Sequence, residues 1–85
     1  MLIQCPSWTL DPEGRAITRR YAFSDFSSCF AFMTRCALLA QTLDHHPDFI
    51  QSYNKLDIRL TTHDAGGLSL LDIEMAKAID VIPSS

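Results

Sequence analysis

The three histidines of the chain lie in two short segments that also hold other polar, proton-exchanging groups. The first segment reads Asp44-His45-His46-Pro47-Asp48, and the second reads Thr61-Thr62-His63-Asp64. An unperturbed imidazole titrates near about pH 6.5, so histidine can both accept and donate a proton at neutral pH. Removal of water from carbon needs one group that takes a proton and another that protonates the leaving hydroxyl. The two segments therefore predict a site for the addition or loss of water.

Two other interpretations of the same residues stay open at this point. Histidines in loops are commonly only solvated or hydrogen-bonded to a neighbour. Three imidazoles with Asp48 or Asp64 could also bind zinc, although adjacent histidines tend to point apart and the spacing matches no common zinc motif. The sequence contains no nucleophile elbow, phosphate-binding loop or dinucleotide fingerprint.

Length and charge narrow the class of protein. The chain has 85 residues, which suits a single domain over residues 1–85. A domain of this size buries only about 60–65% of its unfolded surface, so we expect a homodimer or homotetramer that buries one more face. The net charge of −3 argues against direct nucleic-acid binding, because phosphate contacts need a basic surface.

Targeting signals are also missing from the sequence as it stands. No apolar run approaches the roughly 18 residues of a membrane span, and residues 1–7 lack the pattern of a signal peptide. We expect no membrane association and a cytoplasmic location. The sequence is also compatible with an additional nuclear location.

The cysteines Cys5, Cys29 and Cys36 are predicted to be reduced and buried. Their number is odd and no Cys-x-x-Cys pair occurs. On a helix, Cys29 and Cys36 would lie roughly 10 Å apart along one face, which is too far for a disulfide. Reduced core cysteines fit the reducing cytosol.

The first part of the chain predicts a β-hairpin. Residues 8–10 are predicted to form a short strand, residues 11–14 have turn chemistry, and residues 16–23 alternate in polarity. Trp8 is expected to pack on the sheet, and Arg19-Arg20 are expected to be a solvated pair on the strand surface.

A second hairpin is predicted after Pro47. Residues 49–53 indicate a strand that packs Tyr53 on the sheet, and Asn54-Lys55 are the expected turn. The strand at 56–62 has the clearest pattern, with one apolar face made by Leu56, Ile58 and Leu60.

Two helices complete the predicted fold. Ser24 or Asp25 can cap a helix that ends at about Leu43, and its apolar residues cover two sides, which is typical of a helix that packs on its own sheet and on another subunit. The second helix starts with the capping box Ser69-Leu70-Leu71-Asp72 and ends before Pro83. The order β-β-α-β-β-α predicts an α+β two-layer sandwich, a four-stranded antiparallel sheet with two helices on one face.

These motifs together resemble a known family. The stretch His45-His46-Pro47-Asp48, the Tyr53-Asn54-Lys55 turn, and Thr61-Thr62-His63-Asp64 followed by Asp72 are similar to the pterin-4a-carbinolamine dehydratases, also known as dimerisation cofactors of a homeodomain transcription activator. The likeness covers roughly residues 8–82. It implies dehydration of 4a-hydroxytetrahydrobiopterin to quinonoid dihydrobiopterin, which recycles the pterin cofactor of aromatic amino-acid hydroxylases, without a metal or organic cofactor.

The resemblance also implies roles for single residues. The catalytic histidines of the family fall on His45, His46 and His63, of which His45 and His63 are assigned to proton transfer and His46 mainly to holding the pterin. The implied substrate-binding residues are Asp44, His45, His46, Thr61, Thr62, His63 and Asp64, and the supporting residues are Gln41 and Asp72. Asp72 matches the family's final acidic position, but its capping role explains it equally well.

The chain departs from the family pattern at Gln41 and Phe49. Gln41 stands where the family has an ionisable residue, and a carboxylate there would raise the pKa of a neighbouring imidazole and orient it. We therefore expect lower activity or a pH optimum shifted downward. Phe49 replaces the usual tryptophan, and most of the N-terminal segment of animal relatives is expected to be missing.

An alternative function on the same fold is a non-catalytic dimerisation or transcription-coactivator module. The two-sided apolar helix after Asp25 and the neutral Gln41 both motivate it. In that case a transcription factor is the expected partner, and the helix surface would serve either that partner or self-association.

Overall fold

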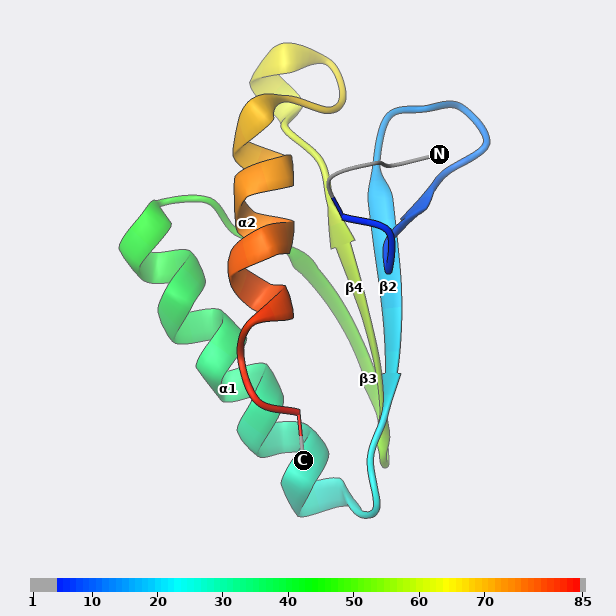
Figure 1. Cartoon of the computed structure of the whole chain (residues 1–85), viewed down its shortest axis with the longest axis vertical. Helices are drawn as coiled ribbons and strands as arrows, with labels where there is room; N and C mark the ends of the chain where they lie inside the picture. The colour runs from blue at the N-terminus through cyan, green and yellow to red at the C-terminus, as the bar shows by residue number, and fades with distance from the viewer. Residues whose placement is uncertain (1–4, 85) are drawn as a thin grey trace.

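The computed structural model describes residues 5–84 and shows two layers, a sheet and a pair of helices that cover one of its faces (Figure 1). The elements in chain order are β1 (Thr9–Leu10), β2 (Ile17–Ala22), α1 (Phe26–Leu43), β3 (Asp48–Ser52), β4 (Lys55–Leu60), the 3-10 turn η1 (His63–Ala65) and α2 (Leu70–Asp80). The predicted α+β fold is confirmed, with one additional short helical turn after β4.

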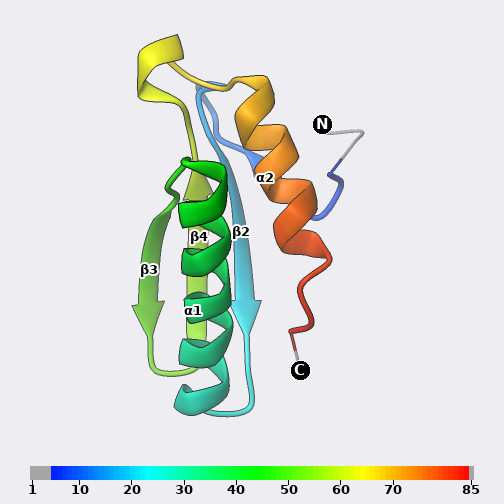
Figure 2. The same cartoon turned by 90° about the vertical axis from the view of Figure 1, so that its left-hand side faces the viewer.

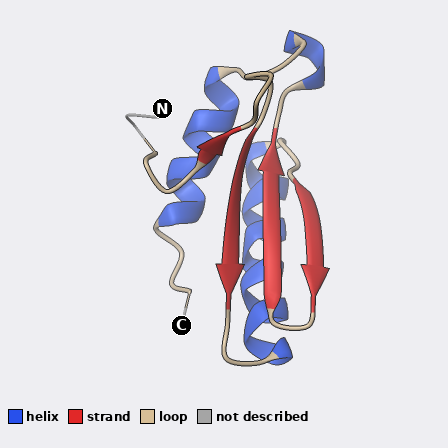
Figure 3. Cartoon of the chain, turned by 90° about the vertical axis from the view of Figure 1, so that its right-hand side faces the viewer, coloured by secondary structure: helices blue, strands red, loops and turns tan. Residues whose placement is uncertain are grey.

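The sheet has four strands in the order β1-β2-β4-β3, and every neighbouring pair is antiparallel. β4 lies between β2 and β3, where Leu56, Ile58 and Leu60 are fully buried against the helices. The predicted face of β4 is thus correct, because residues two apart in a strand point to the same side. Figure 3 shows the opposite face of the sheet, which carries no helix.

α1 begins at a clear cap. The Asp25 side chain accepts a hydrogen bond from the Ser28 backbone N–H at 2.8 Å, which satisfies one of the free donors of the first turn. The helix runs along β4 (Figure 2) and buries the side that carries Cys29, Phe32, Cys36 and Ala40. The side that carries Phe26 and Phe30 stays about half exposed, and these two rings stack on each other at 6.0 Å.

The hydrophobic core lies between the sheet and both helices. α2 contributes Met75, Ala76 and Ile79, and β1 is preceded by the buried Trp8. All three cysteines are free and buried, as predicted. Burial raises the pKa of the Cys36 thiol to about 11, so this thiol stays protonated at neutral pH.

Two expectations about surface residues are wrong. Tyr53 does not pack on the sheet, because β3 ends at Ser52 and Tyr53 occupies the turn with φ 50° and a mostly exposed ring. Arg19 and Arg20 do not share one solvated surface, since neighbouring residues of a strand point to opposite faces, and only Arg20 is well exposed. Arg19 lies over the Tyr21 ring and pairs with Asp80, whereas Arg20 forms two hydrogen bonds with Asp57 on the open face.

None of the helices within residues 5–84 has both the length and the hydropathy that crossing a bilayer requires.

Candidate active site

A cleft of about 290 Å³ opens at the end of the molecule where α1 ends, β4 ends and α2 begins. Three separate segments meet there, namely the connection from α1 to β3, the η1 turn and the first turn of α2 (Figure 1). The cleft is lined by Asp44, His45, His46, Thr61, Thr62, His63 and Asp64. These are the seven residues that the resemblance assigns to substrate binding, so the fold brings both histidine segments to one place.

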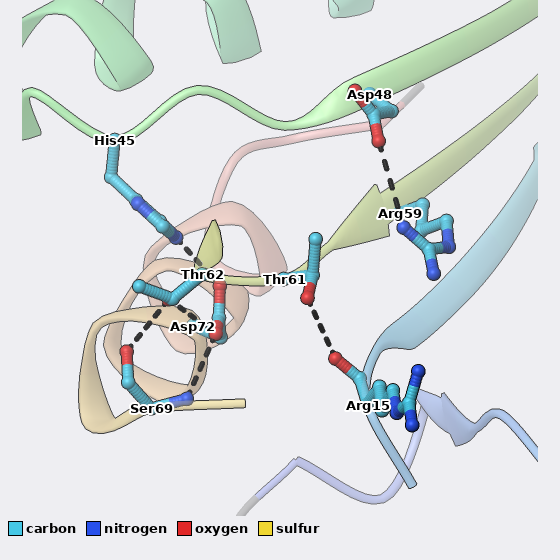
Figure 4. Close-up of polar contacts among 8 residues, drawn as sticks. All are labelled: Arg15, His45, Asp48, Arg59, Thr61, Thr62, Ser69 and Asp72. Carbon is cyan, nitrogen blue, oxygen red and sulfur yellow. Dashed lines mark hydrogen bonds and ion pairs between the residues drawn. The ribbon is translucent and has the colours of Figure 1, made fainter. Parts of the chain in front are cut away.

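His45 is the most firmly held of the three histidines. Its Nε2 lies 2.6 Å from Oδ1 of Asp72, and its side chain is 11% exposed while the Asp72 side chain is fully buried. Asp44, the residue before it, ends α1 in the left-handed conformation with φ 52°. This sharp change of direction turns the backbone so that His45 faces α2 (Figure 4).

The hydrogen bonds around Asp72 show which atom of His45 is free to react. Oδ2 of Asp72 accepts from the Ser69 backbone N–H at 3.0 Å and from the Thr62 hydroxyl at 2.8 Å. A carboxyl group that accepts this many bonds is in its ionised, acceptor-only form. Because Oδ1 must then also accept, His45 donates its Nε2–H to Asp72. The Nδ1 atom is left as the basic nitrogen of the neutral ring.

His46 and Gln41 make a much weaker contact. The His46 Nε2 lies 3.4 Å from Oε1 of Gln41, near the limit of a hydrogen bond, and both residues are exposed. The two adjacent histidines are thus held very differently. His46 keeps the freedom to adjust to a ligand, whereas His45 does not.

His63 stands on a short, tightly closed turn. The backbone of Thr62 pairs with that of Gly67 in both directions, at 2.9 and 3.2 Å, and η1 fills the loop between them. Gly66 takes φ 72° to end η1, a conformation that glycine adopts without strain. The result is an exposed imidazole on a rigid support at the mouth of the cleft.

The two threonines beside His63 use their hydroxyl hydrogens within the protein. Thr61 donates to the Arg15 carbonyl oxygen at 2.7 Å, and Thr62 donates to Asp72 (Figure 4). A hydroxyl has only one hydrogen, so neither can donate a second bond to a ligand. Only the methyl groups, remaining lone pairs and backbone of Thr61 and Thr62 are free for contacts within the cleft.

A larger hollow, of about 870 Å³, lies on the open face of the sheet, away from all three histidines. Its charged side chains are already paired. Arg20 binds Asp57 at 2.6 Å, and Arg59 lies 3.7 Å from Asp48 and 3.9 Å from Asp11. The hollow has no imidazole and no unpaired base to move a proton, so the smaller cleft is the better candidate for chemistry.

Sequence reasoning missed the hydrogen bond that joins His45 to Asp72. The capping box predicts that Asp72 accepts from the Ser69 backbone, and it does. The same carboxylate also holds His45, a contact across 27 residues that no local pattern can reveal. Within residues 5–84, no three His, Cys, Asp or Glu side chains gather as a metal site would require.

Comparisons with known proteins agree with this picture. A four-stranded antiparallel sheet covered by two helices is also the architecture of a pterin dehydratase from Brucella melitensis, described as a transcriptional coactivator/pterin dehydratase. Its crystal structure matches with a TM-score of 0.80 and 45% identity over 87% of this chain and 79% of that one. The chain belongs to the family Pterin 4 alpha carbinolamine dehydratase, which matches residues 1–82.

Bacterial relatives with similar sequences carry the name of the same family. A protein of Rhodospirillum rubrum is 56% identical over 77 residues, covering 91% of this chain and 80% of the relative. One from Rhizorhabdus wittichii is 53% identical over 77 residues, covering 91% and 79%. Both carry the name pterin-4-alpha-carbinolamine dehydratase only provisionally.

A more distant structure shares the fold alone. It is a pterin dehydratase-like protein identified as a RuBisCO assembly factor in the α-carboxysome, with a TM-score of 0.74, 20% identity, and coverage of 87% of this chain and 86% of that one.

Proposed function

We propose that the chain dehydrates 4a-hydroxytetrahydrobiopterin to quinonoid dihydrobiopterin by histidine general acid–base catalysis and so recycles the cofactor of aromatic amino-acid hydroxylases. The observation that carries the proposal is the pairing of His45 with the buried Asp72 at a cleft that His63 also lines. Membership of the pterin carbinolamine dehydratase family supports the same reaction.

The chemistry of a carbinolamine suits two imidazoles. Its carbon carries a hydroxyl and a nitrogen, so loss of water breaks the carbon–oxygen bond and makes a carbon–nitrogen double bond. One proton must reach the departing hydroxyl and one must leave the nitrogen. We assign these two transfers to Nδ1 of His45 and to the His63 ring, and we assign His46 to holding the pterin. No metal or organic cofactor takes part in the proposed reaction.

A stopped-flow assay tests this proposal. Enzymatically generated 4a-hydroxytetrahydrobiopterin is mixed with the protein, and quinonoid dihydrobiopterin formation is followed by absorbance. We expect the rate to rise in proportion to protein concentration above the uncatalysed rate. No acceleration at micromolar protein would contradict the proposal.

A second candidate function is a dimerisation or coactivator module. The specific observation is that the part of α1 not buried against its own sheet leaves large apolar side chains exposed: Phe26, Phe30 and Leu38. Exposed apolar surface of this kind is typical of an interaction site. In this proposal the exposed side of α1 defined by Phe26, Phe30 and Leu38 serves either a homodimer or homotetramer, or a transcription-factor partner.

Light scattering coupled to size exclusion separates these uses of α1. We expect a dimer or tetramer, and we expect Leu38→Lys to lower the mass because a charge would be buried at the contact. A wild-type monomer at micromolar concentration would rule out self-association and leave the surface free for another partner. Substitution of Thr34, which is exposed on the same helix, by serine serves as the control.

A further inference from the structure

The Thr62 side chain links the second histidine segment to His45 of the first through Asp72. It directly precedes His63 in the chain, and its hydroxyl lies 2.8 Å from Oδ2 of Asp72, the carboxylate that holds His45. The Thr62 backbone also closes the η1 loop through its paired bonds with Gly67. A displacement of Thr62 would therefore change both histidines together.

The direction of the hydrogen bonds at Thr62 follows from the number of its hydrogens. The single hydroxyl hydrogen is donated to Asp72, because the ionised carboxylate can only accept. The Ser69 Oγ lies 2.7 Å from the Thr62 Oγ1. Ser69 must then donate to Thr62. A directed chain results, in which Ser69 donates to Thr62, and Thr62 and His45 both donate to Asp72.

This chain fixes the carboxylate from two sides. The Ser69 backbone N–H and the Thr62 hydroxyl both bind Oδ2, which leaves Oδ1 aimed at His45. Without the Thr62 hydroxyl, Oδ2 would keep one donor and the carboxylate could rotate about its own axis. Groups that orient a ligand or base through a second residue commonly change activity by about 10- to 100-fold when removed.

We propose that Thr62 is a positioning residue: it holds Asp72 in place, and through Asp72 it keeps His45 in the Nε2–H tautomer and correctly oriented relative to His63. The part of the inference that concerns rate rests on the proposed dehydration. The part that concerns the tautomer does not, because it is a property of the free protein.

The experiment measures ring-nitrogen chemical shifts of His45 by NMR, together with kcat and KM, in the wild type, Thr62→Val and Thr62→Ser. At about pH 9, where imidazoles are neutral, we expect wild-type His45 to show one protonated nitrogen, Nε2. Thr62→Val, which keeps the branched shape, should move both shifts toward a mixture of tautomers. It should also lower kcat about tenfold with KM changed by less than about twofold. Thr62→Ser should restore both.

Thr34→Val is the matched control, because Thr34 also donates its hydroxyl hydrogen, to the Phe30 carbonyl oxygen at 2.9 Å on the exposed side of α1. It should leave the His45 shifts and kcat unchanged.

Wild-type shifts and kcat in Thr62→Val would overturn the inference, as would a loss of kcat that serine does not restore. A wild type without dehydratase activity would contradict the proposed function, and the tautomer would still decide the role of Thr62. If Thr62→Val does not fold, Ser69→Ala decides instead: a smaller shift in the same direction supports the inference, and no shift overturns it.

Discussion

The helix α2 carries a carboxylate near each end, and the two make hydrogen bonds of the same length for different purposes. Asp72, in the first turn, lies 2.6 Å from the His45 Nε2. Asp80, at the last position, lies 2.6 Å from the Arg19 guanidinium and 2.7 Å from the Trp8 indole nitrogen. Both clusters tie α2 to distant parts of the chain.

The difference lies in the partners. A guanidinium and an indole N–H keep their protons at every physiological pH, so the Asp80 cluster can only hold the fold together. An imidazole changes its charge near neutral pH, and that of His45 has a second nitrogen at a cleft. A short, partly buried ion pair such as Arg19–Asp80 therefore does not by itself mark a site. A carboxylate marks a candidate site when its partner can exchange a proton and lies at a cleft, as His45 does.

The largest effect is expected from removal of the two histidines that we propose transfer protons. His45→Ala and His63→Ala should each lower kcat by about 100-fold or more in the stopped-flow assay, since a positioned acid or base contributes about 10²–10⁴-fold. Circular dichroism should show that both variants remain folded. A wild-type rate in either variant would exclude that histidine from the mechanism.

Removal of the Asp80 carboxylate should affect stability. Asp80→Asn weakens the bonds to Arg19 and Trp8, and we expect a loss of about 1–3 kcal/mol in the free energy of unfolding. For a domain of this size that corresponds to a Tm lower by about 4–8 °C per kcal/mol. Scanning calorimetry checks this, and an unchanged Tm would show that the cluster adds nothing to the fold.

The free energy of unfolding should also fall at alkaline pH because of Tyr21, which lies beside Arg19. Burial raises the pKa of Tyr21 from 10.0 to about 12. In this range the unfolded chain loses the phenol proton and the folded chain keeps it, so stability falls as the pH rises from 10 toward 12. Tyr21→Phe should reduce the drop in the urea midpoint between about pH 8 and pH 11. A drop as steep as in the wild type would mean that other groups, such as Cys36, account for it.

The smallest effect is expected at Gln41. Its contact with His46 is 3.4 Å long and exposed, so the charge introduced by Gln41→Glu would be well screened. We expect the pH optimum of dehydration to move upward by less than one pH unit, because a carboxylate favours a protonated imidazole nearby. Gln41→Met serves as the uncharged control of similar length. A downward move would contradict the expected role of this position.

The elements of the fold were predictable because each has a local signal. The alternation in β4 predicted the correct buried face of that strand, and the capping box at Ser69 predicted the correct start of α2. The buried side of α1 was less clear, because apolar residues surround the helix. Cys29, Phe32 and Cys36 turned out to mark it.

The candidate site was only partly predictable. The two histidine segments could be found by residue type, and the sequence resemblance placed them together. The bond from Asp72 to His45 joins positions 27 residues apart, and the link through Thr62 depends on where β4 ends relative to α2. Contacts of this kind depend on how the elements pack in three dimensions, and local patterns in a single sequence do not predict that packing. The role of Arg19 depends on a similar contact, its ion pair with Asp80 across 61 residues, whereas Tyr53 was misplaced because β3 ends at Ser52.

The comparison of Asp72→Asn with Asp80→Asn in the stopped-flow assay tests the central claim most directly. Asparagine keeps the shape at both positions and can still accept the capping hydrogen bond at the start of α2. We predict that Asp72→Asn lowers kcat by about 10- to 100-fold, because the amide NH2 that then faces His45 donates to Nε2 and favours the opposite, Nδ1–H tautomer. Asp80→Asn should keep the wild-type kcat at a temperature where it is folded. Equal kcat values in the two variants would contradict the claim that Asp72 organises the active site.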